Sequence, residues 1–118
     1  MPRILVLDDE PLISALLGDW LSELSCEMIG PTDSVLGALK LIDDMSLDGA
    51  IIDVSLRGEQ SDAVAEALRA RSIPFAFATG YDRSDVASRF PGDVILTKPF
   101  RFDEVEAAIG KFREHYQG

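Results

Sequence analysis

The sequence predicts a single α/β domain in which a five-stranded parallel sheet is covered by helices on both faces. Short apolar runs alternate five times with segments whose apolar residues recur at helical spacing. Strands that are separated by helices form parallel sheets with right-handed crossovers. The 118 residues fit one domain, and the hydrophobic fraction of 47% is sufficient for one core.

The first strand and helix are the clearest elements of this pattern. Residues 3–7 form an uninterrupted β-prone run, as expected of a strand that is buried on both faces. Pro11 suits the first turn of the following helix, because this turn leaves its backbone N–H groups unpaired. Apolar residues then recur at helical spacing as far as Leu24. Residues 27–31 are expected to form a weaker strand, since only two of them are strongly apolar.

The second helix leads to a strand that ends in an acidic residue. Asp33 or Ser34 can cap a helix whose buried face runs as far as Ile42. The third strand covers Ala50–Asp53, so the apolar run stops at an aspartate. Residues 55–61 are mostly polar and contain a glycine, which predicts a loop.

The second half of the chain continues the alternation. Strands are expected at residues 74–79 and 93–97, and helices at residues 63–68, 84–90 and 102–116. Gly80 ends the fourth strand, and Pro91-Gly92 stops the short helix that precedes the fifth. The last helix carries its apolar residues on one face and closes the domain.

Polar residues follow four of the predicted strands at the point where each strand ends. They are Asp8-Asp9, Asp53, Thr79 and Lys98. The carboxyl ends of parallel strands meet at one edge of an open α/β sheet, and ligands bind there. Each residue alone has an ordinary explanation, such as helix capping or exposure on the surface. Four of them at one edge predict a functional site.

The acidic residues at this edge predict a bound cation. Two carboxylates roughly 5 Å apart repel each other by about 3 kcal/mol at an effective dielectric constant near 20. Asp8, Asp9 and Glu10 follow one strand, and Asp53 ends another. A fold tolerates such a cluster when a divalent cation binds to it or when one carboxylate is protonated.

Phosphoryl transfer to a carboxylate is the chemistry that needs these residue types together. Asp53 would be the nucleophile. Mg²⁺ prefers oxygen ligands, which Asp9, Asp53 and a backbone oxygen just after Asp53 can supply. Thr79 can donate its hydroxyl hydrogen to one phosphoryl oxygen, and Lys98 can place a positive charge beside another.

Over nearly its whole length the chain resembles the receiver domain of two-component response regulators. The motifs that carry the resemblance are Asp8-Asp9-Glu10-Pro11, Ile52-Asp53, Thr79-Gly80 and Lys98-Pro99-Phe100. The resemblance implies a flavodoxin-like (βα)5 fold with strand order 2-1-3-4-5. It also implies that residues 1–118 form one receiver domain without an effector domain.

The resemblance assigns roles to the residues at the strand ends. It makes Asp53 the phosphoacceptor, Asp9 a direct Mg²⁺ ligand and Asp8 a ligand that acts largely through water. The backbone carbonyl of Ser55 completes the protein ligands. A cis peptide bond between Lys98 and Pro99 would direct the lysine inward, and proline lowers the cost of this isomer.

A narrower resemblance concerns the fourth strand and the residues after it. Phe75-Ala-Phe77-Ala-Thr79-Gly-Tyr81 looks like the signature of a subgroup of single-domain receivers nicknamed FATGUY, found in alphaproteobacteria. Most receivers carry a tyrosine or phenylalanine on the fifth strand, three residues before the lysine. Ile95 occupies this position here. In most receivers this aromatic side chain swings inward on phosphorylation. Tyr81 is therefore a candidate for part of that role here, and Ile95 is the second switch candidate.

The resemblance implies a stand-alone phosphoacceptor in a two-component system or phosphorelay. A histidine kinase or a histidine phosphotransfer protein would donate the phosphoryl group, and a downstream protein could read the modified state. The domain would be a monomer or weak dimer. It would catalyse only its own phosphorylation and dephosphorylation, and would not be an enzyme that turns over a separate substrate.

Three alternatives differ in what they require of the sequence. Aspartate-nucleophile phosphatases need a second aspartate two residues after the nucleophile, where this chain has Ser55. A flavodoxin-like flavin protein would need a phosphate-binding turn after the first strand, and the acidic residues there would repel the flavin phosphate. A degenerate receiver that signals without phosphate would lack site residues, and all the main ones are present.

Composition limits the partners. The net charge of −10 argues against nucleic acid and anionic membrane surfaces, which attract basic proteins. No apolar run reaches the length of a membrane helix, and no signal peptide is recognisable, so the expected location is the cytoplasm. Cys26 lies in an apolar stretch and is expected to be a small buried residue.

Overall fold

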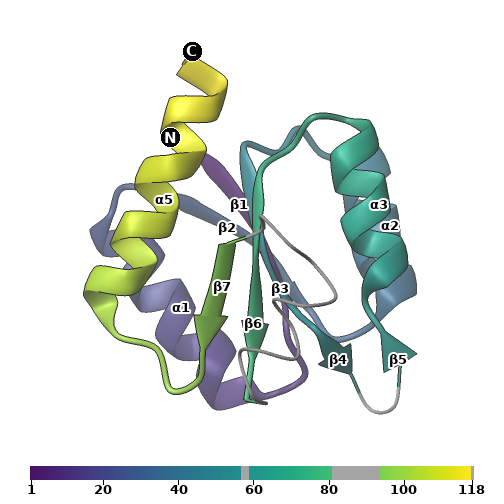
Figure 1. Cartoon of the computed structure of the whole chain (residues 1–118), viewed down its shortest axis with the longest axis horizontal. Coiled ribbons are helices and arrows are strands. Elements are labelled where there is room, and N and C mark those ends of the chain that lie inside the picture. Colours follow the sequence, from purple (N-terminus) through teal and green to yellow (C-terminus); the bar gives the residue numbers. More distant parts are fainter. Residues whose placement is uncertain (57–58, 81–93, 118) are drawn as a thin grey trace.

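A five-stranded parallel sheet forms the centre of the protein (Figure 1). The computed structural model describes residues 1–56, 59–80 and 94–117. The strands are β1 (Arg3–Leu7), β2 (Glu27–Thr32), β3 (Gly49–Asp53), β6 (Phe75–Thr79) and β7 (Val94–Thr97). Their order is β2-β1-β3-β6-β7. This is the predicted order 2-1-3-4-5 when the two short strands β4 and β5 are left out of the count.

Helices cover both faces of the sheet, as the alternating pattern predicts. The described helices are α1 (Pro11–Glu23), α2 (Val35–Asp44), α3 (Asp62–Ala70) and α5 (Phe102–Gln117). Figure 1 shows α1 and α5 on one face and α2 and α3 on the other. The short helix predicted over residues 84–90 lies outside the described residues.

The core has two halves, one on each face of the sheet. Alternate residues of β1 point to opposite faces. Leu5 and Leu7 belong to the half that packs against α2 and α3, whereas Ile4 and Val6 belong to the half under α1 and α5. Cys26 is buried in the second half, as predicted.

The prediction of a loop over residues 55–61 was wrong. β4 (Ser55–Leu56) pairs with β5 (Glu59–Gln60) in a small antiparallel hairpin. Leu56 is completely buried in the core and holds this segment against the domain. The hydroxyl and the backbone N–H of Ser61 both donate to the carbonyl of Val54, each at 3.1 Å, and so close the base of the hairpin.

The second strand is longer than predicted and is irregular at its end. Its pairing with β1 shifts register between Leu5 and Leu7, and Gly30 in this region has a φ of 99°. This backbone conformation favours glycine, because other residues meet a steric penalty there. After the shift the backbone N–H of Asp8 donates to the carbonyl of Thr32 at 3.0 Å. The end of β2 is thereby fixed beside the first acidic residue.

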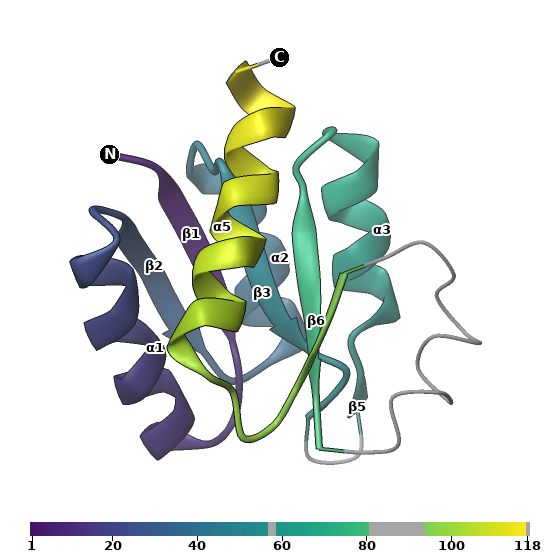
Figure 2. The ribbon, with the colours of Figure 1, turned by 60° about the vertical axis from the view of Figure 1, so that its left-hand side comes forward.

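The ends of the chain lie away from the carboxyl ends of the strands. Figure 2 shows the N-terminus and the last turns of α5 toward the opposite end of the sheet. None of the helices within the described ranges combines the length and the apolar character that a membrane span requires.

Candidate functional site

Strand register brings the predicted site residues to one edge of the sheet. Leu7 of β1 lies opposite Ile52 of β3, so Asp8, which follows β1, and Asp53, the last residue of β3, lie at the same level. On the far side of β3, Asp53 lies opposite Ala78 of β6. The polar residues therefore converge because the apolar runs before them end in register.

Strands β6 and β7 extend this edge. Thr79 of β6 lies opposite Thr97 of β7. The backbone N–H of Lys98 donates to the carbonyl of Thr79 at 2.8 Å, which fixes the start of the segment after β7. The Lys98–Pro99 peptide bond is cis, the isomer that the resemblance implies.

Four carboxylates form an acidic cluster at this edge. Asp8, Asp9, Glu10 and Asp53 each place a carboxylate oxygen within 4.8 Å of the others. Asp8 and Asp53 are buried, with relative exposures of 4% and 7%. Negative groups this close repel one another, and burial reduces the screening by water. The cluster therefore stores an unfavourable energy that a cation would relieve.

Lys98 provides positive charge inside the cluster. Its Nζ lies 3.0 Å from Asp8 Oδ2, 2.7 Å from Glu10 Oε1 and 3.0 Å from Asp53 Oδ2. Burial alone would lower the pKa of the ammonium group, but its close contacts with the carboxylates of Glu10, Asp8 and Asp53 together raise the pKa well above its usual range. The lysine is therefore fully charged at neutral pH.

The donor set fits a magnesium ion. Oxygen atoms of several carboxylates at one point are the ligands that Mg²⁺ takes from proteins, usually with retained water. The Oδ1 atom of Asp8 accepts a hydrogen bond from the backbone N–H of Glu10 at 2.9 Å. Its Oδ2 atom is buried and has Lys98 as an ion-pair neighbour, but no aligned hydrogen-bond donor. Such a buried oxygen has coordination capacity to spare.

The other predicted residues are placed less directly at the cluster. Thr79 is completely buried at the end of β6, the strand next to Asp53. Ser55 begins β4, two residues after Asp53. Ile95 is buried in the core beside Phe77, its register partner on β6. Tyr81 lies outside the described residues.

Glu10 is a site residue to which the sequence assigns no role of its own. It belongs to the acidic motif after the first strand, yet the predicted ligands stop at Asp9. In the structure its carboxylate contacts Lys98 and joins the acidic cluster, although 57% of its side chain is exposed. The signal in the sequence is the third consecutive acidic position, but spacing alone does not show where a long side chain turns.

The chain matches a known sequence family and several solved structures over nearly its whole length. The sequence model described as the response regulator receiver domain matches residues 4–110. SdrG from Sphingomonas melonis Fr1, known from a solution structure, is 47% identical with a TM-score of 0.85, and the match covers 95% of this chain and 96% of that chain. TrrA from Thermotoga maritima, crystallised in complex with Mg²⁺-BeF, is 32% identical with a TM-score of 0.80, and covers 95% of this chain and 99% of its own.

The curated relatives are longer proteins. The phyllosphere-induced regulator PhyR from Methylorubrum extorquens is 30% identical over 113 residues, which cover 92% of this chain and 42% of PhyR. The transcriptional regulatory protein TcrA from Mycobacterium tuberculosis is 33% identical over 44% of its length. The chain thus spans less than half the length of the curated relatives that it matches, but nearly all of SdrG and TrrA.

Proposed function

The chain belongs to the family of response regulator receiver domains, and we propose that it accepts a phosphoryl group on Asp53 from a histidine kinase or a histidine phosphotransfer protein. The observation that carries this proposal is the position of Asp53. It ends the central strand β3 inside the acidic cluster, with Lys98 Nζ 3.0 Å from its Oδ2. A buried carboxylate beside a fixed positive charge is suited to receive a phosphoryl group.

In the proposed transfer, a carboxylate oxygen of Asp53 attacks the phosphorus of a phosphohistidine. The new P–O bond forms as the P–N bond breaks, and the electron pair of that bond stays on the imidazole nitrogen. The donor imidazole carries a proton on its other nitrogen before transfer, so it leaves as the neutral ring. Hydrolysis resets the domain, because water attacks the phosphorus and returns inorganic phosphate and the free carboxylate of Asp53.

The side chains around Asp53 would position the phosphoryl group and balance its charge. Lys98, which already contacts Asp53, would bind one phosphoryl oxygen as an ion pair. The hydroxyl of Thr79 would donate a hydrogen bond to another. Transfer through a loose transition state depends mainly on such positioning and electrostatic stabilisation.

A magnesium ion is part of the proposal. Asp8, Asp9 and Asp53 would hold it together with the carbonyl of Ser55, and the ion would offset negative charge on the transferring oxygens. Two similar receivers support this chemistry. TrrA was crystallised in complex with Mg²⁺-BeF, and SdrG was also solved in a BeF3-activated conformation at 47% identity.

The domain is proposed to act as a switch and not as an enzyme with a separate substrate. Ser55 stands where an aspartate-nucleophile phosphatase needs its second aspartate. The aspartyl phosphate would then be a signalling state whose lifetime is set by its own hydrolysis. The downstream reader would be another protein that distinguishes the two states.

Phosphorylation by a small donor tests the function directly. The protein is incubated with phosphoramidate and Mg²⁺, and its intact mass is measured. We expect a gain of one phosphoryl group in the wild type and none in Asp53→Asn. Asp48→Asn, at the opposite end of the sheet, is the matched control and should retain the gain. A wild type that stays unmodified, or an Asp53→Asn variant that is modified equally, would refute the assignment.

A further inference from the structure

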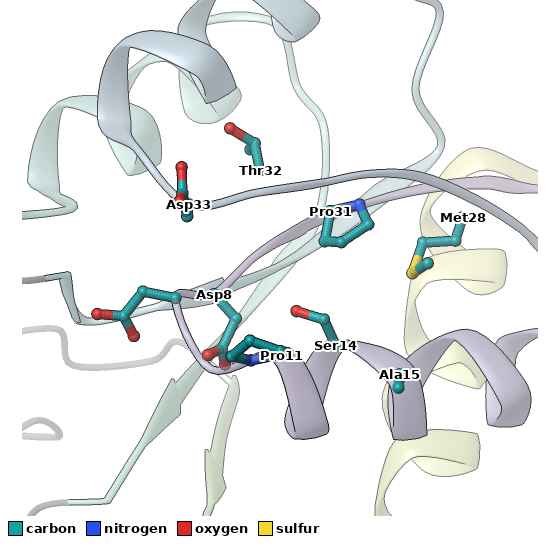
Figure 3. Close-up of a pocket in the computed structure, with 9 residues that line it drawn as sticks. Asp8, Pro11, Ser14, Ala15, Met28, Pro31, Thr32 and Asp33 are labelled. Atoms are coloured by element: carbon teal, nitrogen blue, oxygen red, sulfur yellow. The ribbon is translucent and has the colours of Figure 1, made fainter.

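A pocket of about 560 Å³ lies beside the acidic cluster, between α1 and the end of β2 (Figure 3). Asp8 and Asp9 form its boundary with the phosphoacceptor site, and Asp33 stands on the opposite rim. Ala15, Met28 and Pro31 form an apolar wall. A volume of this size lies within the range of pockets that bind small molecules or anchoring side chains.

The chemistry of the pocket selects a ligand with a positive head and an apolar stem. Three carboxylates line it, and no lysine or arginine occurs among its described lining residues. Lys98 already pairs with Asp8, so Asp9 and Asp33 supply the remaining negative charge of the lining. Arginine and lysine side chains combine these two properties, because their methylene stems pack on apolar surfaces while the charged ends reach polar groups.

We propose that this pocket binds a basic side chain, arginine or lysine, of the protein that donates the phosphoryl group. This inference rests on the function proposed above. The stem packs against Met28 and Pro31, and the charged end reaches Asp33 on the rim, because Asp8 and Asp9 are assigned to the magnesium ion. The net charge of −10 adds a general attraction for a basic partner surface.

The location of the pocket identifies the donor as its occupant. Asp8 and Asp9 line the pocket and also belong to the acidic cluster around Asp53. A donor protein that brings its phosphohistidine to Asp53 must cover this edge of the sheet. Its neighbouring side chains therefore reach the pocket in the same encounter.

Two exposed leucines that are close in sequence to residues of the pocket support a protein partner. Leu12, next to Pro11 on α1, is 84% exposed, and Leu36, in the first turn of α2, is 78% exposed. Leu36 follows Asp33 by three residues. Apolar side chains that surround a charged anchor exclude water from it and so strengthen its contacts in a protein interface.

Pocket variants with matched controls test the proposal. Asp33→Lys reverses a charge on the rim, and Ala15→Leu narrows the apolar wall. Asp44→Lys makes the same charge change on the exposed far end of α2, and Ala107→Leu makes the same size change on an exposed position of α5. The substrate is whichever histidine kinase or phosphotransfer protein of the source organism phosphorylates the wild type. Phosphoramidate serves as the small donor in parallel.

We expect kcat/KM for transfer from the protein donor to fall about tenfold in both pocket variants, mainly through slower association and weaker docking. Both controls should stay within about twofold of the wild type. Rates with phosphoramidate should be unchanged in all four variants, which also shows that each variant is folded. A donor variant in which a basic residue is changed to glutamate and which restores transfer to Asp33→Lys would identify the docked side chain.

The remaining outcomes overturn the proposal and separate it from the function on which it rests. Transfer at wild-type rates to both pocket variants would refute the docking site while leaving the phosphoacceptor intact. A spermidine-induced rise in the melting temperature that Ala15→Leu abolishes, with transfer unimpaired, would assign the pocket to a free cation. If phosphoramidate fails on the wild type, the phosphoacceptor function itself is wrong. If only protein donors fail, both the protein donor and this docking site are wrong.

Discussion

Charged residues at the two ends of the central sheet are stabilised in opposite ways. At the amino ends of the strands, Arg3 Nε lies 3.3 Å from Glu27 Oε1, with both side chains partly exposed. Asp48 accepts a hydrogen bond from the backbone N–H of Arg3 at 2.8 Å and returns one from its own N–H to the carbonyl of Arg3. Each carboxylate there has its own donor.

At the carboxyl ends, the four carboxylates of the acidic cluster lie together, and Lys98 contacts three of them, Asp8, Glu10 and Asp53. The side chains of Asp8, Asp53 and Lys98 are all at least about nine-tenths buried, so water screens them poorly. An excess of buried negative charge lowers stability. This unfavourable charge indicates that the carboxyl ends are arranged for binding a cation and a phosphoryl group. The amino ends, in contrast, are arranged for folding alone.

Removing the positive charge at each end should give the largest contrast. Lys98→Met leaves the buried carboxylates without their cation, so we expect the free energy of unfolding to fall by about 3 kcal/mol in the absence of divalent ions. Arg3→Met breaks a partly exposed pair and should cost less than about 1 kcal/mol. Urea denaturation of both variants measures the difference. Equal losses would contradict the contrast between the two ends.

Magnesium should stabilise the folded protein by binding at the carboxyl ends of the strands only. At a free concentration about 100 times its dissociation constant, an ion that binds only the folded state adds about 2.7 kcal/mol of stability. We therefore expect a higher melting temperature with Mg²⁺, reversed by EDTA, in the wild type and in Asp48→Asn. Asp9→Asn should lose this response. An equal response in Asp9→Asn would show that the ion does not bind at the acidic cluster.

In the absence of metal, replacing aspartate with asparagine should raise the free energy of unfolding at one end of the sheet and lower it at the other. Asp9→Asn removes one repelling charge, so we expect the protein to gain about 1 kcal/mol of stability. Asp48→Asn weakens the hydrogen bond to the backbone of Arg3, so we expect a loss of about 1 kcal/mol. Both are measured by urea denaturation in EDTA. A loss in Asp9→Asn would mean that the cluster is not under electrostatic strain.

The sequence predicts the sheet and the convergence at its edge because both depend on local patterns. Buried parallel strands read as continuous apolar runs, and the polar residue after each run falls at the same edge. Asp8 and Asp53 reach the same level because Leu7 and Ile52 are in register, as runs of similar length allow. The fold class therefore follows from the sequence pattern, whereas the strand order was predicted from the resemblance to receiver domains.

The features that the sequence did not predict depend on contacts between distant residues. The hairpin of β4 and β5 forms because Leu56 is buried in the core, and a single leucine among polar residues does not reveal this. The contact of Glu10 with Lys98 joins residues 88 positions apart. The register shift at the end of β2 needs the positive φ of Gly30.

The smallest expected effect is that of pH on the contribution of Lys98. Because its pKa is raised in the folded protein, its stabilising contribution is complete below the pKa of an unfolded lysine, about 10.4, and is lost only as the pH rises through the higher folded value. The difference in unfolding free energy between wild type and Lys98→Met should therefore stay constant from pH 7 to pH 9, as should the difference for Arg3→Met. Urea denaturation at three pH values measures both. If the difference for Lys98→Met alone shrank toward pH 9, Lys98 would be losing its proton between pH 7 and pH 9. The two ends of the sheet would then differ in protonation as well as in their excess of negative charge.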